Sequence, residues 1–395
     1  MDQMTARISS YLDENKDEII GILKNLIDHE SWAREPDTVL AAQNYFRTEL
    51  EKEGFVCRLV DVGANAPTMV AVLGADRPGK PIVFGGHVDT VFPKGTLKEI
   101  PFRIDEEGRM YGPGVHDMKG GLVVALATVK VLNHLGYEER PIKFVVSGDE
   151  EINHTGSTSA QVFEDTAKGA LCAFNFEPGT EQDKLVTGRK GNIRFGVTVH
   201  GVSAHAQMAN APGVVSAIRE MAYKVADWHA ITDWDRGTSV NVGLIHGGTA
   251  ANTVPDLCTA ELDIRFTTAA EMERAKSQFE EVCRKTYLEG TKTEWEYLCI
   301  MDVFETTDGV KKLFGFMQDV AKKHGFAVPG SQYRGGGSDA AYFARAGVPT
   351  LCGCGVMGNY MHTLREYATL ESLLSQPKLL ATAILEMNDQ LTVAE

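Results

Sequence analysis

Five short apolar or glycine-rich segments of this chain end in a histidine or an acidic residue. The side chains that follow these segments are His87 and Asp89, Asp117, Glu150 and Glu151, Glu177, and His362. In an open α/β sheet, ligands bind beyond the carboxyl ends of the strands. We therefore expect these side chains to meet at one edge of a sheet.

The residue types at these ends indicate a catalytic metal centre. Imidazole and carboxylate groups without a thiolate are the ligands of catalytic divalent metals. Two histidines with three or four carboxylates are too many for one zinc ion. They suit two metals that share a bridging carboxylate, which would clamp an attacking water and a developing oxyanion.

The segments around these residues alternate between strand and helix. Apolar runs bounded by turn residues predict strands over 68–73, 81–86, 142–147 and 169–176, and helical periodicity covers 4–30, 37–54 and 120–135. This alternation predicts a mainly parallel sheet with helices on its faces. The runs Ile82-Val83-Phe84 and Phe144-Val145-Val146 are apolar throughout, which is typical of buried parallel strands.

The pattern changes after about residue 190. Strands are predicted at 194–200, 239–244, 258–266 and 294–301, with helices at 213–229 and 269–287. This β-α-β-β-α-β order is the split ferredoxin-like pattern, which can stand as an inserted domain. Helices at 309–324, 339–346 and 369–391 and a strand at 350–353 then resume the first pattern. We expect a catalytic α/β domain over 1–190 and 305–395, and an inserted lid and dimerisation domain over 191–304.

The bulk composition limits the classes of partner. The chain has 395 residues, a net charge of −15 and 43% apolar residues. An acidic surface argues against nucleic acid or an anionic membrane as the main partner, and no apolar run is long enough to span a bilayer. Seven scattered cysteines and the absence of an apolar leader favour a reducing cytoplasm. Cys352 and Cys354 could bind a metal, although buried thiols are the simpler interpretation.

Several long motifs, in a characteristic order, carry a resemblance to a known family. They are Gly85-Gly86-His87-Val88-Asp89-Thr90, Gly114-Val115-His116-Asp117-Met118-Lys119-Gly120-Gly121, Asp149-Glu150-Glu151, Ser203-Ala204-His205, Gly247-Gly248-Thr249-Ala250-Ala251-Asn252-Thr253-Val254-Pro255 and Gly336-Gly337-Ser338-Asp339. The chain resembles the two-zinc peptidase and aminoacylase family, which includes glutamate carboxypeptidase, succinyl-diaminopimelate desuccinylase, acetylornithine deacetylase and aminoacylase. The resemblance covers nearly the whole chain.

The resemblance implies a role for each residue of the predicted centre. Asp117 would bridge two zinc ions, with cobalt or manganese as alternatives. His87 and Glu177 would bind one ion, and Glu151 and His362 the other. Asp89 would orient His87, and Glu150 would be the general base that deprotonates the attacking water.

The same resemblance implies roles for residues of the predicted lid. His205 would stabilise the oxyanion from the lid of a second subunit, which requires a homodimer. Asn252 and Arg265 would hold the substrate carboxylate. Lys190, at the hinge into the lid, would lie near the substrate, and Gly336 belongs to a loop that lets backbone approach the site closely.

Other residues of these motifs are expected to have no part in the chemistry. His116 lies beside Asp117, but the family does not hold a histidine there as a ligand. We place His154 at the pocket rim or on the surface. Gly335-Gly336-Gly337 resembles a phosphate loop, yet no Lys-Ser/Thr pair follows it, so nucleotide binding is not expected.

Together these features predict a zinc-dependent carboxypeptidase that cleaves the amide bond to an amino acid with a free carboxylate. A deacylase of N-acyl amino acids is the alternative, since it differs only on the acyl side. A non-catalytic relative should lack a ligand or the base, and none is missing here. An aminopeptidase would need an acidic group for the substrate ammonium, whereas Arg265 and Asn252 suit a carboxylate.

Overall fold

A computed structural model describes residues 3–180 and 183–392 of the chain. These residues form two compact units. Unit 1 comprises the described residues up to Gly188, together with Thr306–Arg334 and those from Ser338 onward. Unit 2 comprises Arg189–Glu305 and the short segment Gly335–Gly337.

The core of unit 1 is a six-stranded sheet. Its strands follow the order β1 (Val56–Val60), β2 (Thr68–Leu73), β6 (Ile142–Ser147), β3 (Ile82–His87), β7 (Cys172–Asn175) and β17 (Thr350–Leu351). The last four strands in this order run parallel, and the β1–β2 and β2–β6 pairs are antiparallel. This is the mainly parallel sheet that the sequence predicts.

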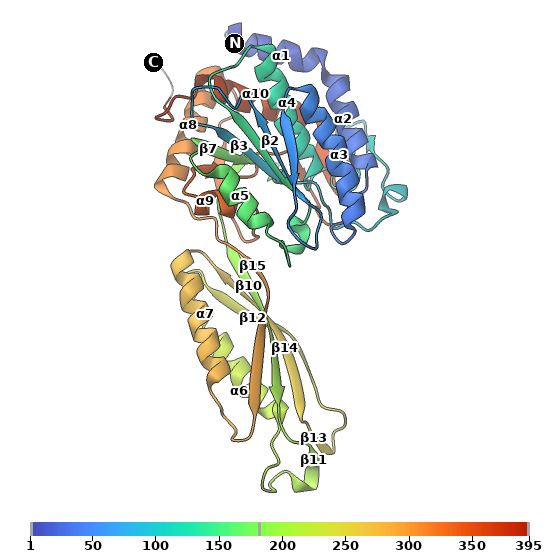
Figure 1. The fold of residues 1–395 in the computed structure, drawn as a ribbon, viewed down its shortest axis with the longest axis vertical. Helices are drawn as coiled ribbons and strands as arrows, with labels where there is room; N and C mark the ends of the chain where they lie inside the picture. The colour runs from blue at the N-terminus through green and yellow to red at the C-terminus, as the bar shows by residue number, and fades with distance from the viewer. Residues whose placement is uncertain (1–2, 181–182, 393–395) are drawn as a thin grey trace. The chain divides into compact units, whose positions relative to one another are not determined.

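Helices cover both faces of this sheet (Figure 1). Helices α3 (Pro36–Lys52) and α4 (Lys119–His134) pack on one face, and α5 (Ser159–Ala167) and α9 (Ala340–Arg345) on the other. Two glycines of β3 allow side chains on both faces of the sheet to approach this strand closely. A Cβ at Gly85 would be 2.4 Å from Phe343 of α9, and one at Gly86 would be 2.2 Å from Met118. This close packing fixes the end of β3, where His87 lies.

The outer helices of unit 1 are α1 (Gln3–Glu14), α2 (Lys16–Asp28), α8 (Asp308–His324) and α10 (Leu370–Glu386). The helical region predicted over 4–30 is divided at Asn15. The backbone of Asn15 leaves the helical region, and its side chain donates to the carbonyl of Tyr11 at 2.8 Å. An asparagine side chain that bonds to nearby backbone competes with helix continuation.

A second sheet of unit 1 consists of very short strands. Its order is β4 (Arg103–Ile104), β5 (Arg109–Tyr111), β19 (Tyr367–Thr369), β18 (Met357–Asn359) and β8 (Gly179–Thr180). A further pair joins β9 (Lys184–Arg189) to β16 (Gly330–Arg334). Strands of two or three residues carry no readable periodicity, so the sequence does not predict this sheet. It matters for the site because the loop between β18 and β19 carries His362.

Unit 2 is an antiparallel sheet with two helices on one face. The strand order is β12 (Ser239–Gly247), β14 (Leu257–Phe266), β10 (Gly191–His200) and β15 (Lys292–Met301). Helices α6 (Ala217–His229) and α7 (Ala269–Arg284) cover it through a core that includes Phe195, Trp228 and Phe279. The β-α-β-β-α-β order matches the predicted one. Two short strands, β11 (Ala204–His205) and β13 (Thr253–Val254), pair at one end.

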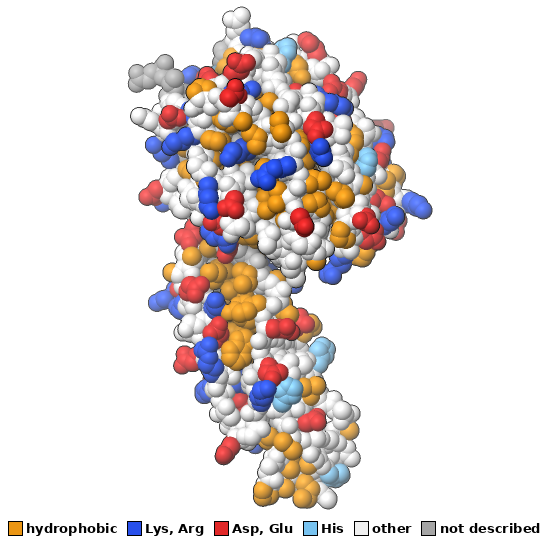
Figure 2. Space-filling view, in the orientation of Figure 1, with side chains coloured by type: hydrophobic (Ala, Val, Ile, Leu, Met, Phe, Trp, Pro, Cys, Tyr) orange, Lys and Arg blue, Asp and Glu red, His pale blue; other side chains and the backbone are white. Residues whose placement is uncertain are grey.

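The surface of both units carries charged side chains together with patches of hydrophobic ones (Figure 2). On the face shown in Figure 2, Lys and Arg side chains are interspersed with Asp and Glu side chains. Among the described residues, no helix is long and apolar enough to cross a bilayer.

Candidate metal centre

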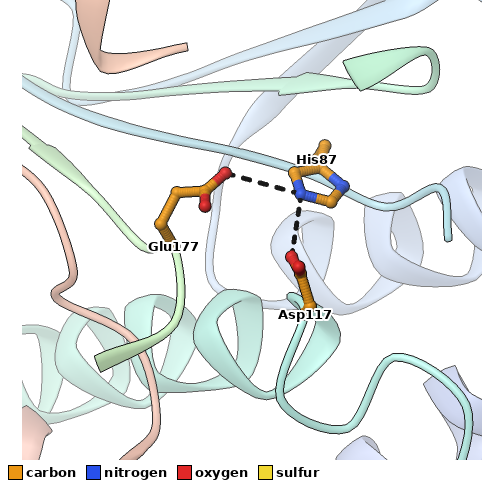
Figure 3. Close-up of side chains that lie close together, drawn as sticks. All are labelled: His87, Asp117 and Glu177. Atoms are coloured by element: carbon orange, nitrogen blue, oxygen red, sulfur yellow. Dashed lines mark ion pairs between the residues drawn. The ribbon is translucent and has the colours of Figure 1, made fainter. Parts of the chain in front are cut away.

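Three of the predicted ligands meet where buried segments of unit 1 end. His87 is the last residue of β3, Asp117 lies just before α4, and Glu177 follows β7. His87 Nε2 is 3.3 Å from Asp117 Oδ1 and 3.5 Å from Glu177 Oε1. Figure 3 shows both carboxylates directed at this one nitrogen. All three side chains are buried, and their donor atoms lie close enough together to hold one cation.

A second group shares Asp117 with the first. His362 Nε2 is 3.1 Å from Asp117 Oδ2 and 3.3 Å from Glu151 Oε2. The two oxygens of Asp117 therefore face different histidines, as a bridging carboxylate requires. The His362 side chain is 50% exposed, whereas that of His87 is 1% exposed. The second group thus lies on the open side of the centre.

The hydrogen bonds around His87 leave one ring nitrogen for a ligand. His87 Nδ1 is 3.0 Å from the backbone oxygen of Asp89 and 3.4 Å from its carboxylate. Among the described residues, the buried His87 Nε2 and Glu151 Oε1 have no hydrogen-bond partner. Polar atoms buried without a partner are costly, and a cation bound at each group of ligands would satisfy them. The residues present therefore fit a metal.

Asp89 connects the two groups of ligands. Its Oδ2 accepts a hydrogen bond from the backbone N–H of Glu151 at 3.0 Å. The predicted role of Asp89 was to orient His87 alone. In the structure the nearer partner of His87 is the backbone carbonyl of Asp89, and the carboxylate also holds Glu151.

The centre carries an excess of buried negative charge. Burial raises the pKa of Glu150 well above its ordinary value, and Glu177 and Asp339 raise it further. Burial and Asp117 raise the pKa of Glu151 to about 7. Burial opposes ionisation of Asp117, but His362 and His87 lower its pKa. A bound divalent cation would stabilise this cluster of carboxylates, because it becomes the largest local charge and reverses the upward shifts of their pKa values.

Glu150 differs from its neighbour Glu151 in its surroundings. Glu150 Oε2 is 3.9 Å from His87 Nε2, and Glu150 belongs to neither group of candidate ligands among the described residues. Both glutamates lie in η2 (Glu150–Ile152), a single 3-10 turn. Adjacent side chains of such a turn can diverge, which the sequence predicts for this pair.

Two buried residues at the centre were not predicted to take part. Glu366 accepts the backbone N–H groups of His116 and Asp117 at 2.8 and 3.1 Å, and so holds the turn of the shared carboxylate. Lys119 donates to the carbonyl of His29 at 2.7 Å. The only available signal for Glu366 was its position four residues after His362, and the residues between them are exposed.

The residues expected to have no ligand role lie as follows. The buried His116 has its Nε2 3.2 Å from the carbonyl of Gly179 and belongs to neither group. Cys352 and Cys354 are buried free thiols. His154 is also buried, so its predicted place on the rim or surface is wrong.

Unit 2 separates the predicted lid residues into two places. His205 pairs with Thr253 across β11 and β13, and the carbonyl of Asn252 accepts the N–H of Ala206, so His205 and Asn252 lie together. Arg265 lies near the far end of β14, eight residues beyond Leu257. At about 3.3 Å per residue, this strand alone separates the two places by roughly 25 Å. Asn252 and Arg265 of one chain therefore cannot both bind the carboxylate of one small substrate.

Arg265, Lys190 and Gly336 all form hydrogen bonds within unit 2. Arg265 donates through Nε and Nη2 to Asp263 at 2.6 and 3.2 Å, and through Nη1 to the carbonyl of Gly335 at 3.3 Å. These bonds use three of its five N–H donors, which leaves two for a substrate. Lys190 donates to the carbonyl of Gly237 at 3.0 Å, and the carbonyl of Gly336 accepts from Arg189 at 3.4 Å.

Comparisons with known proteins agree on one family. The model of peptidase family M20/M25/M40 matches residues 83–386. The chain is 28% identical over 373 residues to carboxypeptidase G2 of Pseudomonas sp. (strain RS-16), a match that covers 93% of this chain and 89% of that protein. It is 28% identical over 345 residues to succinyl-diaminopimelate desuccinylase of Paracidovorax citrulli, which covers 80% and 85% of the two chains. The structure of a tripeptidase from Staphylococcus aureus superimposes with a TM-score of 0.77 at 21% identity, covering 94% of this chain and 98% of that one.

Proposed function

The chain belongs to peptidase family M20/M25/M40 and is a hydrolytic enzyme, and from this premise we propose that it is a two-zinc carboxypeptidase. Its substrate would have an amide nitrogen on an amino acid whose α-carboxylate is free. The observation that carries the proposal is the Asp117 carboxylate, whose two oxygens face His87 and His362 separately.

Each of the two groups of ligands would hold one metal ion. His87, Asp117 and Glu177 would hold one zinc ion, and Asp117, Glu151 and His362 the other. When bound, the pair of ions would activate a water and polarise the scissile carbonyl. Cobalt or manganese would serve the same oxygen and nitrogen ligands.

Glu150 would move the proton. It is largely buried beside the centre, and among the described residues it belongs to neither ligand group. A carboxylate beside the centre that binds no metal can accept a proton from the attacking water and return it to the leaving nitrogen. Asp89 and Glu366 would keep the ligands in place through the N–H groups of Glu151 and Asp117.

The lid residues would act from two chains. Because His205 and Asn252 lie at one end of unit 2 and Arg265 at the other, a single small substrate can reach both only if they come from different subunits. Arg265 of one chain would bind the substrate carboxylate, and His205 of the second chain would stabilise the oxyanion. This arrangement requires a homodimer.

We expect the free carboxylate of the substrate to be required. Converting it to an amide should raise KM and lower kcat together, because the lid would lose the contact that closes it over the substrate. Hydrogen bonds to charged groups contribute about 1.5–3 kcal/mol, so kcat/KM should fall about 10- to 10²-fold. The measurement is hydrolysis of matched dipeptides with free and amidated carboxyl ends, with zinc, cobalt or manganese added. Equal turnover of the two forms would refute the carboxylate contact.

A deacylase of N-acyl amino acids is the second candidate. The match to a succinyl-diaminopimelate desuccinylase favours it, because that relative is as similar in identity as the carboxypeptidase. The same metal centre and carboxylate contact would serve both reactions. A panel that pairs each dipeptide with the N-acetyl and N-succinyl derivatives of the same C-terminal amino acid separates them by kcat/KM.

A further inference from the structure

A buried histidine lies between two buried aspartates directly after the turn that carries Glu150 and Glu151. His154 Nδ1 is 2.7 Å from Asp149 Oδ1, and His154 Nε2 is 2.6 Å from Asp339 Oδ1. Both aspartates have no exposed side-chain surface. The three residues form what we call the Asp149–His154–Asp339 bridge.

The hydrogen bonds around the bridge indicate which of its atoms donate. Asp149 also accepts from Ser157, from Ser159 at 2.8 Å and from Asn65 at 3.0 Å, so its oxygens are fully occupied as acceptors. His154 must therefore donate through Nδ1. Burial alone would lower the pKa of His154, but Asp339 and Asp149 raise it well above its ordinary value. Burial raises the pKa of Asp339 as well, so a proton lies between His154 Nε2 and Asp339 Oδ1, and both ring nitrogens of His154 are hydrogen-bonded to an aspartate.

The backbone conformation of the turn also indicates that the side chain of His154 has a role, because glycine would suit this position better. Asn153 and His154 have φ values of 53° and 51°, in the left-handed region that glycine adopts without steric cost. A histidine in that conformation costs conformational energy. The bonds from its ring to Asp149 and Asp339 offset that cost, and glycine could not make them.

Apart from the bond between the Glu151 N–H and Asp89, the bridge supplies the side-chain contacts that hold this turn. None of the three side chains of η2 is fully buried, so apolar packing does not fix them. Asp149 precedes the turn and His154 follows it, and the His154 N–H closes it on the carbonyl of Asp149 at 2.9 Å. On the other side, Asp339 accepts from Ser147, the residue beside His87 in the sheet. The bridge therefore connects the turn to the elements that carry the other ligands.

We propose that His154 is a positioning residue, and that the Asp149–His154–Asp339 bridge holds Glu150 and Glu151 in their places for the reaction. The proposal rests on the proposed function, since it assigns Glu150 to the proton transfer and Glu151 to a metal. Among the described residues, the ring of His154 bonds to Asp149 and Asp339, which belong to neither ligand group. Its loss should displace the turn, and a displacement of about 1 Å at a catalytic group can cost about 10²-fold in rate.

Two glycine substitutions form a matched pair that tests this role. His154→Gly and Asn153→Gly both relieve a positive φ, but only the first removes the bridge. We expect Asn153→Gly to keep kcat within about twofold, a change that leaves the positioned groups in place. We expect His154→Gly to lose about 10²-fold in kcat with little change in KM. It should also bind cobalt about tenfold more weakly, because outer contacts of a metal site contribute that much to affinity.

A second pair covers the case in which His154→Gly does not fold. In His154→Gln the side-chain amide donates to one aspartate but turns its oxygen toward the other. In the double variant His154→Gln/Asp339→Asn, donors and acceptors match again without the charges. We expect the double variant to recover most of the kcat and cobalt affinity that the single variant loses, a coupling that a double-mutant cycle measures. A double variant no better than His154→Gln would overturn the proposal.

The cobalt titration separates this proposal from the proposed function. If the wild-type protein hydrolyses no member of the substrate panel, the proposed function fails and cobalt affinity alone tests the bridge. Equal cobalt affinity and, where turnover is measurable, equal kcat in His154→Gly and Asn153→Gly would overturn the positioning role.

Discussion

A Glu150→Gln variant is expected to keep its metals and lose most of its turnover. An amide cannot accept the proton of the attacking water, and general base catalysis typically contributes about 10²–10⁴-fold to the rate. Glu150 Oε2 lies 3.9 Å from His87 Nε2, and Glu150 belongs to neither ligand group among the described residues. The measurement is kcat together with metal content, for example by atomic absorption on the purified variant.

The neighbouring glutamate provides the matched control. Glu151 lies 3.3 Å from His362 and within reach of the same cation as Asp117. Glu151→Gln should therefore weaken binding of one metal, whereas Glu150→Gln should not. If Glu150→Gln loses metal and Glu151→Gln keeps it, the roles of the two residues are reversed.

The second large effect is expected from His205→Ala, about 10²–10³-fold in kcat with the metals intact. A single donor to a developing oxyanion contributes that much. His205 Nδ1 accepts the N–H of Gln207 at 3.3 Å, which places the ring proton on Nε2. The side chain is exposed, so Nε2–H is available to a substrate carbonyl. A structural histidine at this position would leave kcat nearly unchanged.

Mixed dimers test whether His205 acts across subunits. His205→Ala and Asp117→Ala should both be inactive alone, the second because its shared ligand is lost. In a mixed dimer, the subunit with intact metals receives His205 from the Asp117→Ala chain, so one of two sites is whole. Co-expression with two tags should restore up to about half of the wild-type activity. Absence of rescue in verified mixed dimers would end the trans-site hypothesis.

The main architecture and the composition of the centre could be predicted because they depend on local signals. The apolar runs over 68–73 and 142–147 correspond to β2 and β6, and the order of elements in unit 2 is the predicted one. The parallel strands bring His87 and Glu177 together because strands of one direction end at one edge of a sheet. That rule needs no knowledge of the loops.

Features that depend on long-range contacts could not be predicted. His154 was predicted at the pocket rim or on the surface, yet its ring is buried against Asp339, 185 positions later in the chain. The distance between Asn252 and Arg265 depends on the length and direction of β14, whereas the motifs give only their sequence separation. The short strands around His362 pair with partners as distant as Tyr111, which no local pattern reveals.

The most direct test of the two-metal account is a zinc titration of the metal-free enzyme. After prolonged chelation and removal of the chelator, hydrolysis of an N-acyl amino acid or dipeptide with a free carboxylate should be absent. Activity should then rise as zinc is added and level off at about two ions per chain, since the two groups that share Asp117 bind one ion each. Full activity in the chelated protein, with metal analysis showing no ion bound, would contradict the account.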